Sequence, residues 1–361
     1  MLIPLAIIFF ALTAIYLAIQ TRPVQNFAAR KLTNYLSEQF GTNIHIGGVD
    51  VALFRRVVLK DVWIEDQHAD TLVYSQRVSA TIDTLNFRKK NLSLSRISFD
   101  HTKAYFEKDS TGILNYQFLA IARKTDLQTG QKWKLSCDRF ILRNSHFSYN
   151  SFQQQIRHFQ IDEVSLRIDN FRLDEDSLSF QVYSMSLNDG KGFYLNEFSA
   201  HFTQVGKDIF ITNLRLETLN SEIDNADITI KQQPMPGTGE TVTDLEIDLF
   251  QSRLSLADIS LFIPQLEGME QKLELSGRVT GNMQNLRARN LNIKTGNNTQ
   301  ILADFSLSNM PGFSEPFIFI DLKQSRSDFR DISRIRLPNS SKVNYLVFPQ
   351  QLYQAGIISY Q

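Results

Sequence analysis

The chain has a single cysteine, Cys137, so no internal disulfide can form. Proline and glycine are scarce, 9 and 16 among 361 residues, which excludes collagen-like and linker-rich disordered chains. Neither sign of charge dominates, because 38 Lys and Arg balance 38 Asp and Glu, and this argues against a nucleic-acid binder. These absences indicate a folded protein held together by burial and backbone pairing.

Signatures of catalysis are also missing from the sequence. The six histidines are scattered, and no HExxH, CxxC, GxSxG or phosphate-binding glycine loop occurs. Cys137 alternates with Trp133 and Leu135, a pattern that favours a core thiol over a nucleophile. We therefore expect no catalytic residue, no metal site and no cofactor, and predict that the protein is not an enzyme.

The N-terminus carries the longest apolar run. Leu2 to Ile19 contains no charge, and these residues would form roughly 27 Å of helix, close to the ~30 Å hydrocarbon core of a bilayer. A cleaved signal peptide is the alternative, but the run lacks a basic start and a small-x-small site. Residues 1–20 are therefore predicted to be a transmembrane anchor, including Leu2, Ile7, Phe10, Ile15 and Ile19.

A second helix is predicted within residues 21–43. Thr21 suits its N-cap, Pro23 its first turn and Gly41 its C-terminal stop. Apolar residues recur at helical spacing and predict an amphipathic element. This helix either caps the start of a sheet, the interpretation that we favour, or lies on the membrane surface. The residues expected on its apolar face are Val24, Phe27, Ala28, Tyr35 and Leu36.

From Ile44 onward the hydrophobic period changes to two. Runs such as Phe198-Ala200-Phe202 alternate apolar and polar residues, which is typical of strands with one apolar and one polar face. Several runs slip by one residue, so that the apolar positions are three apart. A bulge in a long strand would keep both halves on one face, whereas a tight turn is the alternative. The slips occur within Leu92–Phe99, Ile209–Leu216 and Leu286–Ile293.

The alternating pattern continues for over 300 residues, longer than a β-sandwich normally needs. It predicts a mainly β fold in which residues 44–361 form an elongated, coiled sheet of repeating units with an apolar groove. The pattern is still running at Gln361, so we expect a longer chain cut short here. The candidate groove-lining residues are Phe180, Val182, Phe198, Phe202, Ile209, Ile211, Ile228 and Ile230.

Two segments of the second half are similar to each other. Leu256-Ala-Asp-Ile-Ser260 precedes Pro264 and a predicted strand from Leu273 to Val279. Phe329-Arg-Asp-Ile-Ser333 precedes Pro349 and a predicted strand from Gly356 to Tyr360. Both indicate a short segment, a turn and a new strand, as in an internal repeat.

These features resemble the N-terminal part of the AsmA-like and TamB-like proteins, the inner-membrane component of the bacterial translocation and assembly module. The resemblance rests on the anchor, on the helix Pro23–Phe40 and on IHIGGVDVALFRRVVLKDVWIED at Ile44–Asp66. It extends over Leu72–Phe87, Leu92–Tyr116 ending in GILNY, LRLETLNSEI at Leu214–Ile223, and Leu256–Asn309.

The resemblance implies a taco-like β-groove in the periplasm, held by a single-pass anchor in the bacterial inner membrane. It also implies transport of phospholipid between the inner and outer membranes and a role in outer-membrane biogenesis. A C-terminal part absent from these 361 residues would meet an outer-membrane barrel protein of the Omp85 type. The alternative is an envelope scaffold that assists outer-membrane protein assembly and carries no lipid. Neither function involves nucleic acid.

Overall fold

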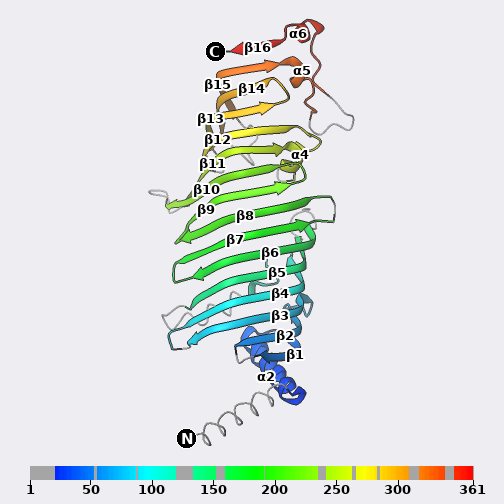
Figure 1. The fold of residues 1–361 in the computed structure, drawn as a ribbon, viewed down its shortest axis with the longest axis vertical. Coiled ribbons are helices and arrows are strands. Elements are labelled where there is room, and N and C mark those ends of the chain that lie inside the picture. Colours follow the sequence, from blue (N-terminus) through cyan, green and yellow to red (C-terminus); the bar gives the residue numbers. More distant parts are fainter. Residues whose placement is uncertain are drawn as a thin grey trace, which may run out of the picture. The chain divides into compact units, whose positions relative to one another are not determined.

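The computed structural model describes residues 21–360, apart from 53–54, 87, 119–132, 152–158, 191, 235–240, 262–265, 283–284, 309–316 and 338–344. The fold is mainly β, as predicted, with 69% strand and 12% helix. Sixteen strands form one open sheet in which their order follows the chain (Figure 1). The contacts divide the chain into two compact units, Met1–Tyr194 and Leu195–Gln361, here called the first and second units.

The part of the first unit that the structure describes contains seven strands. They pair antiparallel with one exception, the parallel pair β4–β5. A parallel pair needs a crossover connection, because the chain must return to the edge at which the previous strand began. The strands are β1 (Ile44–Ala52), β2 (Arg56–Glu65), β3 (Thr71–Asn86), β4 (Asn91–Lys108), β5 (Lys134–Ser151), β6 (Phe159–Leu173) and β7 (Ser177–Asn188).

The second unit is built from strands that all pair antiparallel with their chain neighbours. They are β8 (Tyr194–Val205), β9 (Asp208–Thr218), β10 (Glu222–Pro234), β11 (Thr241–Ser255), β12 (Lys272–Asn282), β13 (Asn285–Thr295), β14 (Thr299–Ser308), β15 (Phe317–Asp328) and β16 (Ile357–Tyr360). Three short helices accompany them, namely α4 (Leu256–Ile259), α5 (Phe329–Ile332) and α6 (Gln350–Gln354).

Helix α2 (Arg22–Phe40) caps the start of the first unit's sheet, which confirms the interpretation that we favoured. It ends at Gly41, whose left-handed φ of 62° lets its N–H bond back to the Ser37 carbonyl. The Ser37 hydroxyl accepts a hydrogen bond from the Ile44 N–H at 3.0 Å and so joins the helix to β1.

The packed face of α2 includes Leu36, as predicted, but otherwise differs from the predicted face. Val24, Phe27 and Tyr35 are exposed, Phe27 by 59% and Tyr35 by 60%. The side chains that face the sheet are Ala29, Leu32, Leu36 and Phe40, which contact Ile44, Ile46 and Val49 of β1. The prediction placed the stripe about a quarter-turn away, because it gave the large aromatic residues more weight than the small Ala29.

The phase slips are β-bulges inside single strands, not tight turns. Ile209–Leu216 lies within β9, Leu286–Ile293 within β13 and Leu92–Phe99 within β4, with shifts in the pairing register in each. In four strands the residue before the resumed apolar position has a left-handed φ: Asp61, Asn170, Asn213 and Asn290. Asn, Asp and His tolerate this conformation better than most residues, and the extra residue keeps both strand halves on one face.

The internal repeat predicted in the second unit is confirmed. LADI and FRDI form one-turn helices α4 and α5, each capped by a buried side chain, Ser255 or Asp328. Asp258 of α4 accepts hydrogen bonds from the hydroxyls of Thr218 and Ser221, both at 2.6 Å.

In α5, Asp331 corresponds to Asp258. Its carboxylate accepts hydrogen bonds from the Asn298 N–H at 2.7 Å and from the Thr299 hydroxyl at 3.2 Å. Each helix therefore anchors the turn of an earlier hairpin, β9–β10 or β13–β14. The predicted strands beginning at Leu273 and Gly356 correspond to β12 and β16, whereas Pro264 lies outside the described residues.

Within the described part of the chain, no helix combines the length and the apolar composition that spanning a bilayer requires. The predicted anchor at residues 1–20, with Leu2, Ile7, Phe10, Ile15 and Ile19, lies outside the described residues.

Candidate functional site

Apolar side chains cross the second unit in continuous rows. Directly paired residues of neighbouring strands point to the same face of a sheet, so the pairing register identifies a row. One row runs from β8 to β15 without a polar residue. Its members are Phe202, Ile211, Ile228, Ile247, Val279, Ala288, Phe305 and Ile320.

Two further rows flank it on the same face. Ile209, Ile230 and Leu245 pair across β9–β11, and that row continues through Leu286 to Leu307. Phe198 begins the other row, in which it pairs with Leu216 and then Ile223. The six second-unit residues predicted from the sequence, Phe198, Phe202, Ile209, Ile211, Ile228 and Ile230, therefore share one face.

The remaining two predicted residues, Phe180 and Val182, lie on β7 in the first unit. Val182 pairs with Ile168, and the row continues through Phe140, Ile97, Ala80, Val57 and Val51. The Phe180 ring stacks on Phe171 with centroids 6.4 Å apart. Both therefore belong to the apolar face of the first unit. That all eight residues line one shared groove stays a prediction.

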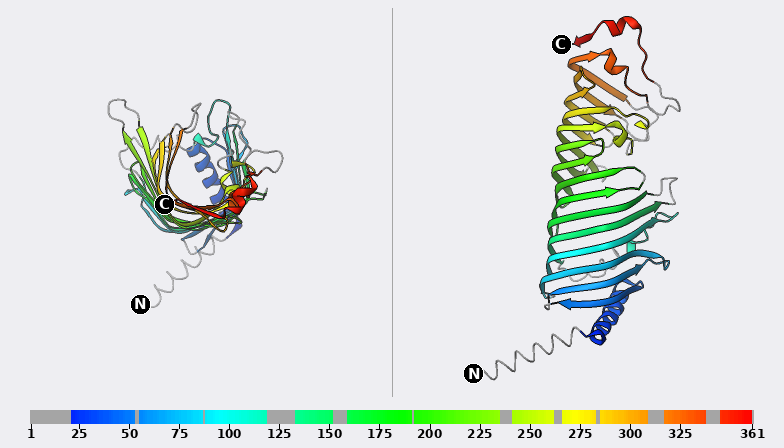
Figure 2. Two further views of the ribbon diagram at one scale, coloured as in Figure 1. Left: turned by 90° about the horizontal axis from the view of Figure 1, so that it is seen from above. Right: turned by 45° about the vertical axis from the view of Figure 1, so that its right-hand side comes forward.

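The strands of the first unit bend along their length, and α2 lies inside the bend (Figure 2). Since α2 packs against Ile44, Ile46 and Val49, the concave face is the apolar one. In the first unit the bulge at Asn170 has the sequence apolar-x-Asn-apolar, and the bulges at Asn213 and Asn290 in the second unit have the same sequence pattern. The bulges of the second unit therefore have the same relation to its apolar rows.

Large side chains on the apolar faces are only partly buried. In the second unit Ala200, Leu214 and Ala226 are buried, while the larger Phe198, Ile211 and Ile228 around them are only partly buried. Across the described residues, Leu72 is the one large apolar side chain with less than 2% exposure. A closed core would bury many of them. The described residues thus leave these faces accessible, apart from the part of β1 and β2 beneath α2.

The opposite face is polar and carries many of the ion pairs. In the second unit Arg278 pairs with Glu246, and Lys323 lies 2.8 Å from Asp304. In the first unit Lys60 lies 2.6 Å from Asp50, and Arg143 lies 3.0 Å from Asp100. The sheet therefore separates an apolar face from a charged one, as the alternating sequence predicted.

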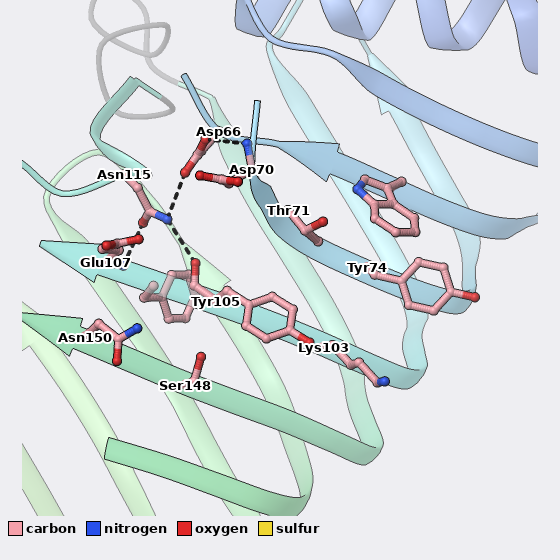
Figure 3. Close-up of a pocket in the computed structure, with 12 residues that line it drawn as sticks. Asp66, Asp70, Thr71, Tyr74, Lys103, Tyr105, Glu107, Asn115, Ser148 and Asn150 are labelled. Carbon is pink, nitrogen blue, oxygen red and sulfur yellow. Dashed lines mark hydrogen bonds between the residues drawn. The ribbon is translucent and has the colours of Figure 1, made fainter. Parts of the chain in front are cut away.

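A pocket of about 500 Å³ lies at one edge of the polar face of the first unit (Figure 3). Tyr74, Lys103 and Tyr105 lie along its strands, and Asp66 and Asn115 close one end. The Asn115 amide donates to the Asp66 carboxylate at 3.3 Å and to the Tyr105 carbonyl at 3.0 Å.

These bonds give the pocket's polar end a structural role. Asp66 is buried and also accepts the N–H groups of His68 and Asp70 at 2.8 and 3.0 Å. Asn115, within the GILNY segment, ties the loop after β4 to the turn between β2 and β3. No local sequence pattern indicates this contact, because 49 residues separate its partners.

Reactive groups on the apolar faces are few. Cys137 pairs with Leu94 and Phe171 and is buried, and this burial raises the pKa of its thiol. No group of three or more His, Cys, Asp or Glu side chains that could hold a metal occurs in the described ranges. What these faces offer a ligand is apolar surface: roughly 0.8 kcal/mol per buried methylene.

No protein-family model, curated protein or solved structure matches the chain.

Proposed function

We propose that the protein is a membrane-anchored envelope protein whose apolar sheet face binds phospholipid acyl chains and conducts them between two membranes. Residues 1–20 are its anchor in the bacterial inner membrane, and the sheet is a taco-like groove in the periplasm. The observation that carries the proposal is the uninterrupted apolar row from Phe202 on β8 to Ile320 on β15. The resemblance to AsmA-like and TamB-like proteins points to the same function.

A ligand can reach the apolar row because most of its side chains are only partly buried. An acyl chain of about sixteen carbons gains roughly 0.8 kcal/mol per methylene that leaves water, so a continuous apolar track binds it without chemical bonds. The headgroup stays hydrated beyond the margin of the sheet. Partly buried Phe and Ile side chains supply such a track, whereas side chains enclosed in a core cannot reach a ligand.

The experiment is mass spectrometry of lipids that remain bound to the full chain after it is extracted in a mild detergent and transferred to amphipol. We expect phospholipid on the wild type and less of it on Phe198→Asp or Ile228→Asp, which introduce a charge into the track. Ser199→Asp and Thr229→Asp place the same charge on the opposite face and serve as matched controls. An equal amount of lipid on all four variants would contradict binding along this track. No lipid on the wild type would support a scaffold that carries no lipid.

A further inference from the structure

The charged face of the first unit holds a group of arginines at the centre of strands β2 to β5. The pairing register places them in two rows. Arg56, Thr81 and Arg96 pair across β2, β3 and β4. Four residues away along β3, Arg77 pairs with Asp100, which pairs with Arg143 of β5.

Two small residues lie between the rows. Ser79 and Ser98 pair with each other, and their hydroxyl oxygens are 2.7 Å apart. Both are 5% exposed. The four arginines and the serines line a hollow of about 440 Å³, together with Thr81, Ser95 and Asp100. Because Ser79 alternates with Val78 and Ala80, the hollow opens on the face opposite the apolar rows.

The hollow has an excess of positive charge. Its four guanidinium groups face a single carboxylate, Asp100, which already accepts a hydrogen bond from Arg143 at 3.0 Å. Arg56, Arg77 and Arg96 are exposed and have no ion pair or hydrogen bond from their side chains within the described residues.

Other cations of the first unit differ from these three. Arg55 pairs with Asp83, Lys60 with Asp50, and Arg139 and Arg167 share Asp169. The chain as a whole has no net charge. The excess of positive charge is therefore a local property of this hollow. Positive charges this close together repel one another unless an anion lies between them.

The spacing suits a small polyanion. Neighbouring strands are about 4.8 Å apart and alternate residues about 6.8 Å. The two arginines of each row are therefore roughly 10 Å apart at Cα, and the rows are roughly 13 Å apart and offset by one strand. The four side chains and the two serines line the same hollow. Guanidinium groups match phosphate oxygens with two parallel N–H donors, and hydroxyls supply further donors.

We propose that this hollow binds a phosphate-bearing anion between the two arginine rows, with Ser79 and Ser98 as hydroxyl donors. The phosphate belongs either to a free diphosphate or to the headgroup of an anionic lipid. The site goes beyond the proposed function, because it lies on the charged face and does not need an acyl chain on the apolar face.

Titration calorimetry of the full chain with inorganic pyrophosphate tests the free form. We expect binding that weakens as salt is raised, since exposed charges are screened. The double variant Arg77→Gln/Arg96→Gln should lower the affinity at least tenfold. Arg215→Gln removes an exposed arginine from the second unit and should change the affinity less than twofold. Circular dichroism checks that the variants remain folded.

The lipid-borne form is tested with dihexanoyl phosphatidylglycerol below its micelle concentration, against dihexanoyl phosphatidylcholine. Binding of the anionic lipid alone, lost in Arg77→Gln/Arg96→Gln, would identify a lipid headgroup as the source. Binding of pyrophosphate, lost in the same variant, would identify a free phosphate. If neither probe binds, or if the double variant binds both as the wild type does, the proposal is overturned.

Discussion

A single aspartate on the apolar face distinguishes an open sheet from a closed core. Ile228 on β10 is half-buried between its partners Ile211 and Ile247, and Ala226, two residues away on the same face, is 2% exposed. In a closed core, either substitution to aspartate would bury an unpaired charge. On an open face, only the aspartate at position 226 would be deprived of water.

The magnitudes follow from burial. Full burial of an isoleucine contributes about 1.5–3 kcal/mol, so losing the partial burial of Ile228 costs roughly 1–2 kcal/mol. The low strand propensity of aspartate adds up to about 1 kcal/mol. Ile228→Asp should therefore lower the free energy of unfolding by about 2 kcal/mol. Ala226→Asp should cost several kcal/mol, because its carboxylate cannot reach water.

Urea unfolding followed by far-ultraviolet circular dichroism measures both values. We expect Ile228→Asp to fold, with a lower urea concentration at the unfolding midpoint and an unchanged dependence of the unfolding free energy on urea. Ala226→Asp should be largely unfolded in buffer. Ile228→Ala separates the lost burial from the added charge and should lie between the wild type and Ile228→Asp. If Ile228→Asp destabilises as much as Ala226→Asp, the face is covered and the open-sheet interpretation is refuted.

Three further predictions concern stability and reactivity. Asn290 has φ 51° at a bulge, so Asn290→Val should cost about 1–2 kcal/mol and Asn290→Gly much less; equal midpoints for both in urea would show that the bulge does not constrain the backbone. The hydrogen bond from Arg330 lowers the pKa of Asp328 to about 2, below its unfolded value near 3.9. The charged Asp328 therefore stabilises the fold above about pH 4, and this contribution is lost as the pH falls towards about 2. Thermal unfolding of Asp328→Asn should depend less on pH across this window than that of the wild type, and equal dependence would contradict the assignment. Burial raises the pKa of Cys137, so its thiol should react with Ellman's reagent only after urea unfolds the chain; rapid labelling of the native protein would show otherwise.

Local patterns in the sequence predicted most of the fold. The period of two identified the strands, since burial of one face of a sheet requires it. Thr21, Pro23 and Gly41 marked the ends of α2, because each suits a specific backbone position at a helix terminus. The slips within Ile209–Leu216 and Leu286–Ile293 predicted bulges, although not the left-handed conformation of Asn213 and Asn290.

Features that depend on which strands pair could not be predicted from local sequence patterns. The parallel β4–β5 pair depends on how the chain returns after Lys108, which no local pattern encodes. Arg56, Arg77, Arg96 and Arg143 are spread over 88 positions and are brought together only by the register of four strands. The sequence pattern predicted the packed face of α2 incorrectly, because exposed aromatic residues extend the apolar stripe beyond the side that contacts the sheet.

Lipid capture at single positions would show whether phospholipid lies along the apolar face. A photocrosslinking amino acid at Ile228 would report on the apolar face, and one at Thr229, its neighbour on β10, on the charged face. Irradiation in cells, followed by mass spectrometry of the purified full chain, should find phospholipid attached at position 228 and not at 229. The same contrast is expected between Phe198 and Ser199. Attachment at neither position of each pair, or equally at both, would contradict a lipid track along the apolar face.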